Sequence, residues 1–431
     1  MASSTNSHPP ALASTASQVF RVALIGAGLL LAGWAFVAGV GCTPPKHGNY
    51  TKEGKNLAKE RIDALKGQTE YQMAMQSFLD ADLEKAGKHI EKAMLLAPKV
   101  ASVFVLRGRI MLEKSDIQQA QASFAKAKEI DPAEVEAYYY SGILSERITL
   151  REEALENYRK ANELDPEKVQ YPIAAADMMI ELGRVDEAEQ YLLQQQVQLH
   201  HTAGVQQMLG KISVLRGDNV QAEKFFTEAR ILASDETSVL EDLARAQFNL
   251  AKWGEAESNL ARLLRSPEYT DRRDLAHMRA KCLNNLNRNA EARDLLVTLT
   301  KGDIGQADVE AWISLGQVAY TLGDWSRVRQ SFVRTISLAP ERPEGYILRG
   351  LHQRRTNDLK GAEQSFRKAI DISPSAENYI ILGLVYQKMH NEPAAKTCFA
   401  KASALDPKDE VARQLVQDPS LASKIAGVSN E

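Results

Sequence analysis

Apolar and polar positions in residues 309–342 alternate with the period of an α-helix. A first stripe comprises Trp312, Leu315, Gly316 and Ala319. The pair Gly323-Asp324 interrupts the pattern. A second stripe follows before Pro340 and comprises Val328, Phe332 and Ile336. The pattern predicts two helices, and the short loop between them forces them antiparallel.

The pattern recurs along the chain with a period of 34 residues. Small residues mark the same phase of each second helix, with two steps of 36 in the later half: Ala86, Ala120, Ala154, Ala188, Ala222, Ala256, Ala292, Val328, Ala362 and Ala395. Prolines near the end of many periods stop the second helix: Pro98, Pro132, Pro166, Pro340, Pro374 and Pro407. A small side chain at the repeated phase lets two helices approach closely.

The repeat resembles the tetratricopeptide repeat family. The family pattern is best matched by Tyr379, Leu382, Gly383, Tyr386, Ala395, Phe399, Ala402 and Pro407. Ten repeats fit residues 67–409, and departures gather in residues 169–302, where the terminal proline becomes His200 and Ser234 and two loops lengthen. The resemblance implies an all-α, right-handed solenoid of about ten helix-turn-helix repeats, with a concave groove lined by the first helices. Residues 410–431 are expected to form a capping helix and a loose tail.

The resemblance also implies that the ninth position of each repeat faces the groove. From the second repeat these positions are Arg109, Ile143, Asp177, Lys211, Arg245, Lys281, Gln317, Leu351 and Leu384. Other concave positions add Ile313, Tyr320, Ile347 and Ile380 at the C-terminal end, and Tyr139 as an anchor near the N-terminal end. We expect a basic central strip and an apolar C-terminal segment, suited to a peptide with acidic and hydrophobic residues. The alternative is a solvated face with scattered charges.

The N-terminal residues differ from the repeats. Arg21 precedes an uncharged apolar run, Val22 to Gly41, which we interpret as a signal peptide or membrane anchor within residues 1–41. Residues 42–66 would then form a linker and a leading helix. Cys42 lies where the apolar run stops, which favours a lipoprotein signal with lipidation at Cys42. The alternative is a single uncleaved span, for which the positive-inside rule would leave the repeats in the cytoplasm, given Lys46, Lys52, Lys55 and Lys59.

Composition narrows the chemistry. The 431 residues carry a formal net charge of −3, so we expect no nucleic-acid partner. Cys42, Cys282 and Cys398 are too few and scattered for a disulfide framework or a thiolate zinc site. His200-His201, and His277 with Cys282, lack the further ligands of a metal site, and Cys282 is expected to be a buried thiol. Nucleotide-binding and hydrolase motifs do not occur, and no cofactor is expected.

These patterns predict a non-enzymatic, membrane-tethered scaffold that binds proteins or peptides in the groove. Resemblance to membrane-bound repeat lipoproteins implies roles such as envelope assembly or secretion. The alternative is a regulatory subunit of a membrane enzyme complex on the cytoplasmic face. A lipoprotein facing the periplasm is favoured over a single-span inner-membrane protein with cytoplasmic repeats.

Overall fold

The computed structural model describes residues 48–196, 199, 202–418 and 421. Contacts divide the chain into two units, residues 1–63 and residues 64–431. The predicted membrane segment 22–41 and the predicted lipidation site Cys42 lie outside the described residues. Among the residues that are described, none of the helices combines the length and the apolar character that a bilayer crossing needs.

The described residues form 22 helices and no strands. In chain order they are α1 (Gly48–Leu79), α2 (Leu83–Leu96), α3 (Ala101–Glu113), α4 (Ile117–Ile130), α5 (Val135–Arg147), α6 (Arg151–Leu164), α7 (Gln170–Glu181), α8 (Val185–Gln196), α9 (Ala203–Leu215), α10 (Asn219–Leu232), α11 (Thr237–Asn249), α12 (Trp253–Leu263), α13 (Arg273–Asn285), α14 (Asn289–Leu299), α15 (Gly302–Gln306), α16 (Val309–Thr321), α17 (Trp325–Leu338), α18 (Pro343–Arg355), α19 (Leu359–Ile372), α20 (Ala376–Lys388), α21 (Glu392–Leu405) and α22 (Glu410–Gln417).

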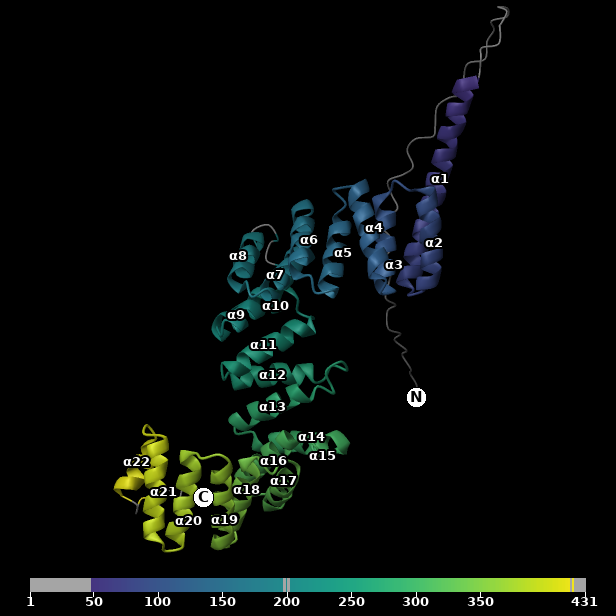
Figure 1. The fold of residues 1–431 in the computed structure, drawn as a ribbon. Coiled ribbons are helices and arrows are strands. Elements are labelled where there is room, and N and C mark those ends of the chain that lie inside the picture. Colours follow the sequence, from purple (N-terminus) through teal and green to yellow (C-terminus); the bar gives the residue numbers. More distant parts are fainter. Residues whose placement is uncertain (1–47, 197–198, 200–201, 419–420, 422–431) are drawn as a thin grey trace, which may run out of the picture. The chain divides into compact units, whose positions relative to one another are not determined.

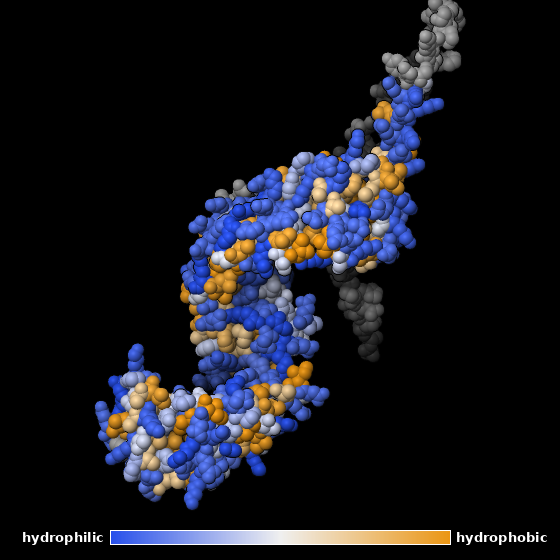
Figure 2. All heavy atoms as spheres, in the orientation of Figure 1, coloured by the Kyte–Doolittle hydropathy of each residue, from blue (hydrophilic) through white to orange (hydrophobic). Residues whose placement is uncertain are grey.

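Helices pair in chain order and stack on their neighbours (Figure 1). The end of α1 with α2 forms repeat 1, α3 with α4 forms repeat 2, and so on to α20 with α21, which form repeat 10; the short α15 is an insertion. First helices of adjacent repeats also touch, as in the series α7, α9 and α11. The predicted all-α solenoid of about ten helix pairs is confirmed. In the view of Figure 2 its surface is mainly hydrophilic, with small groups of apolar side chains between the charges.

The turn inside every pair uses a left-handed residue. The fifteenth residue of each repeat has a φ between 56° and 78°. These residues are Ala81, Ser115, Thr149, Gly183, Gly217, Ala251, Asn287, Gly323, Asn357 and His390. An aspartate often follows and caps the second helix, as where Asp116 accepts a hydrogen bond from the backbone N–H of Gln119 at 3.1 Å. The predicted break at Gly323-Asp324 is therefore one instance of a turn common to all ten repeats.

The repeated small residue of each second helix is fully buried. From Ala86 to Ala395, all ten residues at this phase have no exposed surface, including the one valine, Val328. Close packing leaves no room for a larger side chain at most of these sites. The prediction from the 34-residue spacing is confirmed at this contact.

A second contact joins the eighth and twenty-fourth residues of most repeats, which we call the 8/24 pair. Repeat 8 departs from it, because a Cβ added at Gly316 would meet Leu348 and Ser331 instead of Phe332. Where the twenty-fourth residue is Phe or Tyr, the eighth is glycine, as in Gly142 with Tyr158 and Gly350 with Phe366. A Cβ added at Gly142 would lie 2.5 Å from Tyr158 Cε1, and one at Gly350 would lie 2.7 Å from Phe366 Cζ. In repeats 4, 6 and 7 the pair is instead alanine with leucine, namely Ala176–Leu192, Ala244–Leu260 and Ala280–Leu296.

Two insertions explain the steps of 36 residues. One lengthens the loop between α12 and α13, and the other adds α15 between α14 and α16. Helix α1 runs without a break through residue 67, the predicted start of the repeats. At the other end α22 buries Ala412 and Leu415 against the last repeat.

Candidate binding groove

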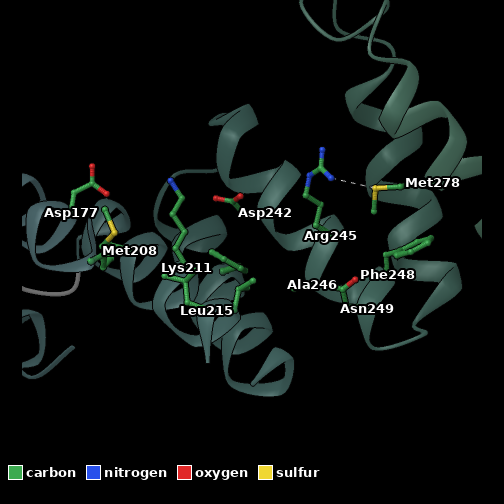
Figure 3. A pocket seen from close by; sticks show the side chains of 13 residues that line it. Asp177, Met208, Lys211, Leu215, Asp242, Arg245, Ala246, Phe248, Asn249 and Met278 are labelled. Carbon is green, nitrogen blue, oxygen red and sulfur yellow. Dashed lines mark hydrogen bonds between the residues drawn. The ribbon is translucent and has the colours of Figure 1, made fainter. Parts of the chain in front are cut away.

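First helices of repeats 4 to 7 line a cavity of about 620 Å³ (Figure 3). Its wall comprises Asp177 and Ile180 of α7, Met208, Lys211, Val214 and Leu215 of α9, Phe226 of α10, Asp242, Arg245, Ala246, Phe248 and Asn249 of α11, and Met278 of α13. The ninth-position residues Asp177, Lys211 and Arg245 thus lie in one cavity. Because α7, α9 and α11 touch in series, the cavity follows the first helices across repeat boundaries.

Most of the cavity wall is apolar. Met208 and Leu215 lie on one side and Phe248 and Met278 on the other, as Figure 3 shows. Leu215 remains 60% exposed, so apolar surface is open to a partner. Methionine side chains are flexible and polarizable and adapt to different apolar groups. The wall can therefore hold a large apolar side chain.

Lys211 is the cation in this cavity without an ion pair among the described residues. Two carboxylates, Asp177 and Asp242, line the same cavity, and Asp242 accepts a hydrogen bond from Gln207 Nε2 at 2.8 Å. Desolvation raises the pKa of both carboxyl groups, with the charges of Glu181 and Glu146 adding to the effect at Asp177. The charge of Lys211 acts against this rise in pKa at both carboxyl groups, but no ion pair holds its ammonium within the described residues, so the ammonium can pair with an incoming acidic group.

Arg245 is already neutralised. Its guanidinium lies 2.8 Å from Glu241 Oε1 and 2.6 Å from Asp274 Oδ2, and it donates a weak hydrogen bond to Met278 Sδ at 3.6 Å. Arg272 binds the same two carboxylates. Hydrogen bonds from Arg272 and then Arg245 hold the pKa of Asp274 well below its usual range. The centre of the groove therefore alternates between positive and negative groups and is less basic than the ninth positions alone indicate.

A second cavity, of about 490 Å³, continues toward the N-terminus. It is lined by Tyr139, Ile143, Glu146, Arg147, Tyr158, Ala174 and Asp177, so Asp177 belongs to both cavities. The ring of Tyr139 packs 5.1 Å from that of Tyr171 and 5.8 Å from that of Tyr158, measured between centroids. Tyr139 is half-buried and presents part of its ring to this cavity.

The remaining cationic ninth positions rest on aromatic rings. Arg109 lies between Phe78 and Tyr140, with its guanidinium carbon 4.9 Å and 4.6 Å from the two centroids. Lys281 Nζ lies 5.4 Å from the centroid of Phe248. Such contacts hold a cation over a ring face. The guanidinium of Arg109 is therefore held by rings within repeats 1 to 3, whereas Lys281 contacts Phe248, a residue of the first cavity, without lining that cavity itself.

The C-terminal groove residues divide into two groups. Ile313 and Ile380 are buried, with Ile380 in the core of the last repeats. Tyr320, Ile347, Leu351 and Leu384 are half-buried. The ring of Tyr320 meets that of Trp325 edge-on at 5.5 Å, and Arg355 lies over Trp325. Only the half-buried group has surface to offer a partner.

Several residues of the groove were missed by the sequence reasoning. Glu241, Asp242 and Asp274 balance the cations, and Met208 and Met278 form much of the apolar wall. The fifth position of each repeat, used above for Tyr139 and for isoleucines at the C-terminal end, reads Gln207, Glu241 and His277 in the middle. Following the fifth position through the middle repeats would therefore have predicted the carboxylate of Glu241 in the groove.

The side chains of His277, Cys282 and Cys398 are held by structural contacts. His277 Nε2 lies 2.9 Å from Asp308 Oδ2, to which Arg273 also binds. Cys282 and Cys398 are buried free thiols, as expected for Cys282. Burial raises the pKa of the Cys282 thiol to about 11, which disfavours the reactive thiolate. Across the described residues, no group of three or more His, Cys, Asp or Glu side chains could hold a metal ion.

Comparison with protein families identifies the repeat. Residues 313–377 and 376–409 match two family models, each described as the tetratricopeptide repeat. The matched residues run from within α16 to beyond the end of α21. The paired helices, left-handed turns and buried small residues of this part recur in all the remaining repeats. The chain belongs to the tetratricopeptide repeat family. Proteins built from tetratricopeptide repeats act as scaffolds for protein interaction.

Solved structures similar to this tetratricopeptide protein include PilW, a widely conserved type IV pilus biogenesis factor, at 21% identity over 48% of this chain and 95% of that one, with a TM-score of 0.42. A tetratricopeptide repeat protein from Parabacteroides merdae is 14% identical over 74% of this chain and 97% of that one, with a TM-score of 0.38. The C-terminal part of a repeat protein from Cytophaga hutchinsonii is 16% identical over 56% and 98%, with a TM-score of 0.44. No curated protein matches the sequence.

Proposed function

We propose that the chain is a non-enzymatic scaffold, tethered to a membrane by its N-terminus, that binds partner proteins in the groove of repeats 4 to 7. The observation that carries the proposal is an apolar cavity with one unpaired ammonium, Lys211, at its wall. Apolar walls with few polar groups are typical of sites that bind a side chain and fix its orientation.

The chemistry of the cavity favours one kind of partner segment. An acidic residue would pair with Lys211, and a large apolar neighbour would pack against Met208, Leu215 and Met278. Asp177 and Asp242 would repel a second acid placed on either side of Lys211. We therefore expect a peptide with a single acidic residue beside apolar residues, rather than a run of acids.

A photo-crosslinking residue at Leu215 tests the assignment in intact cells. The captured partner is identified by mass spectrometry, purified and titrated against the chain. Lys211→Glu should weaken its binding at least tenfold, because it places a third carboxylate between Asp177 and Asp242. Lys224→Glu is the matched control, since Lys224 is exposed on the second helix of the same repeat. Equal affinity of the two variants would reject the groove.

The tether is supported by the apolar run Val22 to Gly41 and by Cys42 directly after it. We propose a lipoprotein that faces the periplasm and works in envelope assembly or secretion. The substitution Cys42→Ala should abolish acylation of the chain. Metabolic labelling with a fatty acid measures that loss. If the variant still incorporates the label, Cys42 is not the lipidation site.

The lysines after the apolar run favour a second candidate. Lys46, Lys52, Lys55 and Lys59 follow the run, against Arg21 before it, and such asymmetry keeps the lysine side in the cytoplasm when a span is retained. The chain would then be a regulatory subunit of a membrane enzyme complex on the cytoplasmic face. Protease added to intact cells and to spheroplasts separates the two, because only periplasmic repeats become accessible once the outer barrier is opened.

A further inference from the structure

The first half of α1 carries a stripe of lysines. Lys52, Lys55 and Lys59 are spaced three and four residues apart, which places them on one face of the helix. All three are exposed, and none forms an ion pair within the described residues. We call these three residues the lysine stripe.

Of the acidic residues in the same segment, Asp63 lies on the face of the lysine stripe, four residues after Lys59, whereas Glu53 and Glu60 lie on another face. Glu53 and Glu60 are seven residues apart and lie roughly a third of a turn from the lysine stripe. An ordinary exposed helix alternates opposite charges at spacings of three and four, where they attract. Here the three lysines repel one another along the helix, and Asp63, at the C-terminal end of the stripe, forms no ion pair with Lys59 within the described residues. A negative partner on that face would relieve the repulsion.

The position of α1 in the chain indicates what that partner is. The helix begins at Gly48, and Lys52 is ten residues after Cys42. Even a fully extended linker of that length reaches only about 35 Å. If the N-terminus is tethered as proposed above, the stripe is held at the membrane surface. Exposed ammonium groups on flexible stems suit a diffuse layer of negative charge.

We propose that the lysine stripe binds anionic lipid headgroups and lays the first half of α1 along the membrane surface. The proposal rests on the proposed tether, which supplies proximity, and adds a second, electrostatic attachment. Attraction of this kind acts within about 8 Å at physiological ionic strength, so it requires the helix to lie against the bilayer. The attachment would fix the direction in which the chain leaves the membrane.

Two residues allow a matched crosslinking test. Ile62 lies beside the stripe and Leu57 on the far side of the helix, and they are 51% and 52% exposed. The full chain, with a photo-crosslinking residue at one or the other, is reconstituted into phosphatidylcholine vesicles with or without one third phosphatidylglycerol. Lipid adducts from Ile62 should exceed those from Leu57 at least threefold in the anionic vesicles, and the excess should vanish in neutral vesicles or 0.5 M salt.

Reversing the charge of the lysine stripe is the second part of the crosslinking test. Lys52→Glu/Lys55→Glu/Lys59→Glu should abolish the excess at Ile62, whereas Lys224→Glu/Lys301→Glu/Lys408→Glu should preserve it. The control set changes the net charge equally at three exposed lysines of the repeats. Helical content by circular dichroism verifies that both variants fold. Equal adducts from Ile62 and Leu57, adducts to protein in place of lipid, or an excess that survives reversal of the stripe would overturn the proposal.

Flotation of the same samples separates this proposal from the tether. A tethered chain floats with neutral and anionic vesicles alike. If it floats with both but shows no preference at Ile62, the tether stands and the lysine stripe does not bind lipid. If it floats only with anionic vesicles and only with the stripe intact, the stripe binds lipid and the tether is wrong.

Discussion

Repeats 6 and 9 form the same contact between their two helices, but with different pairs of residues. Repeat 9 packs Phe366 of α19 over Gly350 of α18, where an added Cβ would lie 2.7 Å from the ring. Repeat 6 packs Leu260 of α12 with Ala244 of α11 in one core cluster. The larger residue at one position accompanies the smaller at the other. The contact is specified by the volume of the pair, because interiors are packed to near-crystalline density.

This difference has a consequence for the groove. Ala244 lies on α11 directly before Arg245, which lines the cavity of repeats 4 to 7. Repeats 4, 6 and 7, which carry the alanine–leucine pair, all contribute first helices to that cavity. Changing the 8/24 pair should therefore test the packing rule and, in repeat 6, the support of the groove together.

Removing the large member of each pair should have the largest effect. Phe366→Ala should lower the free energy of unfolding by about 3–5 kcal/mol, and Leu260→Ala by about 2–5 kcal/mol, because both leave a cavity. Repeat arrays unfold segment by segment, so hydrogen exchange of α18–α19 and α11–α12 measures each loss locally. If Phe366→Ala lowers the free energy of unfolding no more than Leu260→Ala does, then Gly350 lets the two helices of repeat 9 move together and fill the cavity.

Exchanging the pairs should have the next largest effect. Gly350→Ala should overpack Phe366 and cost about 1–3 kcal/mol, as should Leu260→Phe against Ala244. Gly350→Ala/Phe366→Leu and Ala244→Gly/Leu260→Phe should each recover most of the loss. Urea denaturation of these four variants and of the single variants Phe366→Leu and Ala244→Gly gives the coupling energy of each pair.

Recovery in neither double variant would mean that neighbouring helices, rather than the partner residue, set the size limit. Partner binding offers an independent readout in repeat 6. Ala244→Gly/Leu260→Phe should bind like the parent chain if it restores the position of α11.

Much of the packing could be predicted from the sequence, because it repeats. The phase of Ala86 to Ala395 identified ten buried sites, since a contact made inside every repeat leaves the same mark every 34 residues. The 8/24 pair also recurs in the sequence, but it is harder to recognise. Its two residues vary together from repeat to repeat, so neither position keeps one residue type. Gly108 and Ala176, for example, occupy the same position of their repeats.

Contacts between repeats were harder to predict. The partner of Arg245, Asp274, is 29 residues away on the next repeat, after a lengthened loop that shifts the register. Ile313 and Ile347 share the fifth position, yet Ile313 is buried and Ile347 is only half-buried. Such differences depend on how closely each first helix approaches the next, which no single repeat encodes. The sequence therefore predicts which residues lie near the groove, whereas the distribution of charge in the groove could not be predicted from it.

The turns of the same two repeats should show the smallest effect. Ala251 of repeat 6 has φ 56° and Asn357 of repeat 9 has φ 63°. Alanine in the left-handed region is strained by about 1–2 kcal/mol, whereas asparagine tolerates it. Ala251→Gly should therefore stabilise by about 0.5–1 kcal/mol after the extra chain entropy of glycine, and Asn357→Gly by less. Thermal unfolding of both variants, with Gly217→Ala as the reverse change, measures the order. A larger gain at Asn357 would mean that the Asn357 side chain strains its turn, so that the two repeats would differ in their turns as well as in their cores.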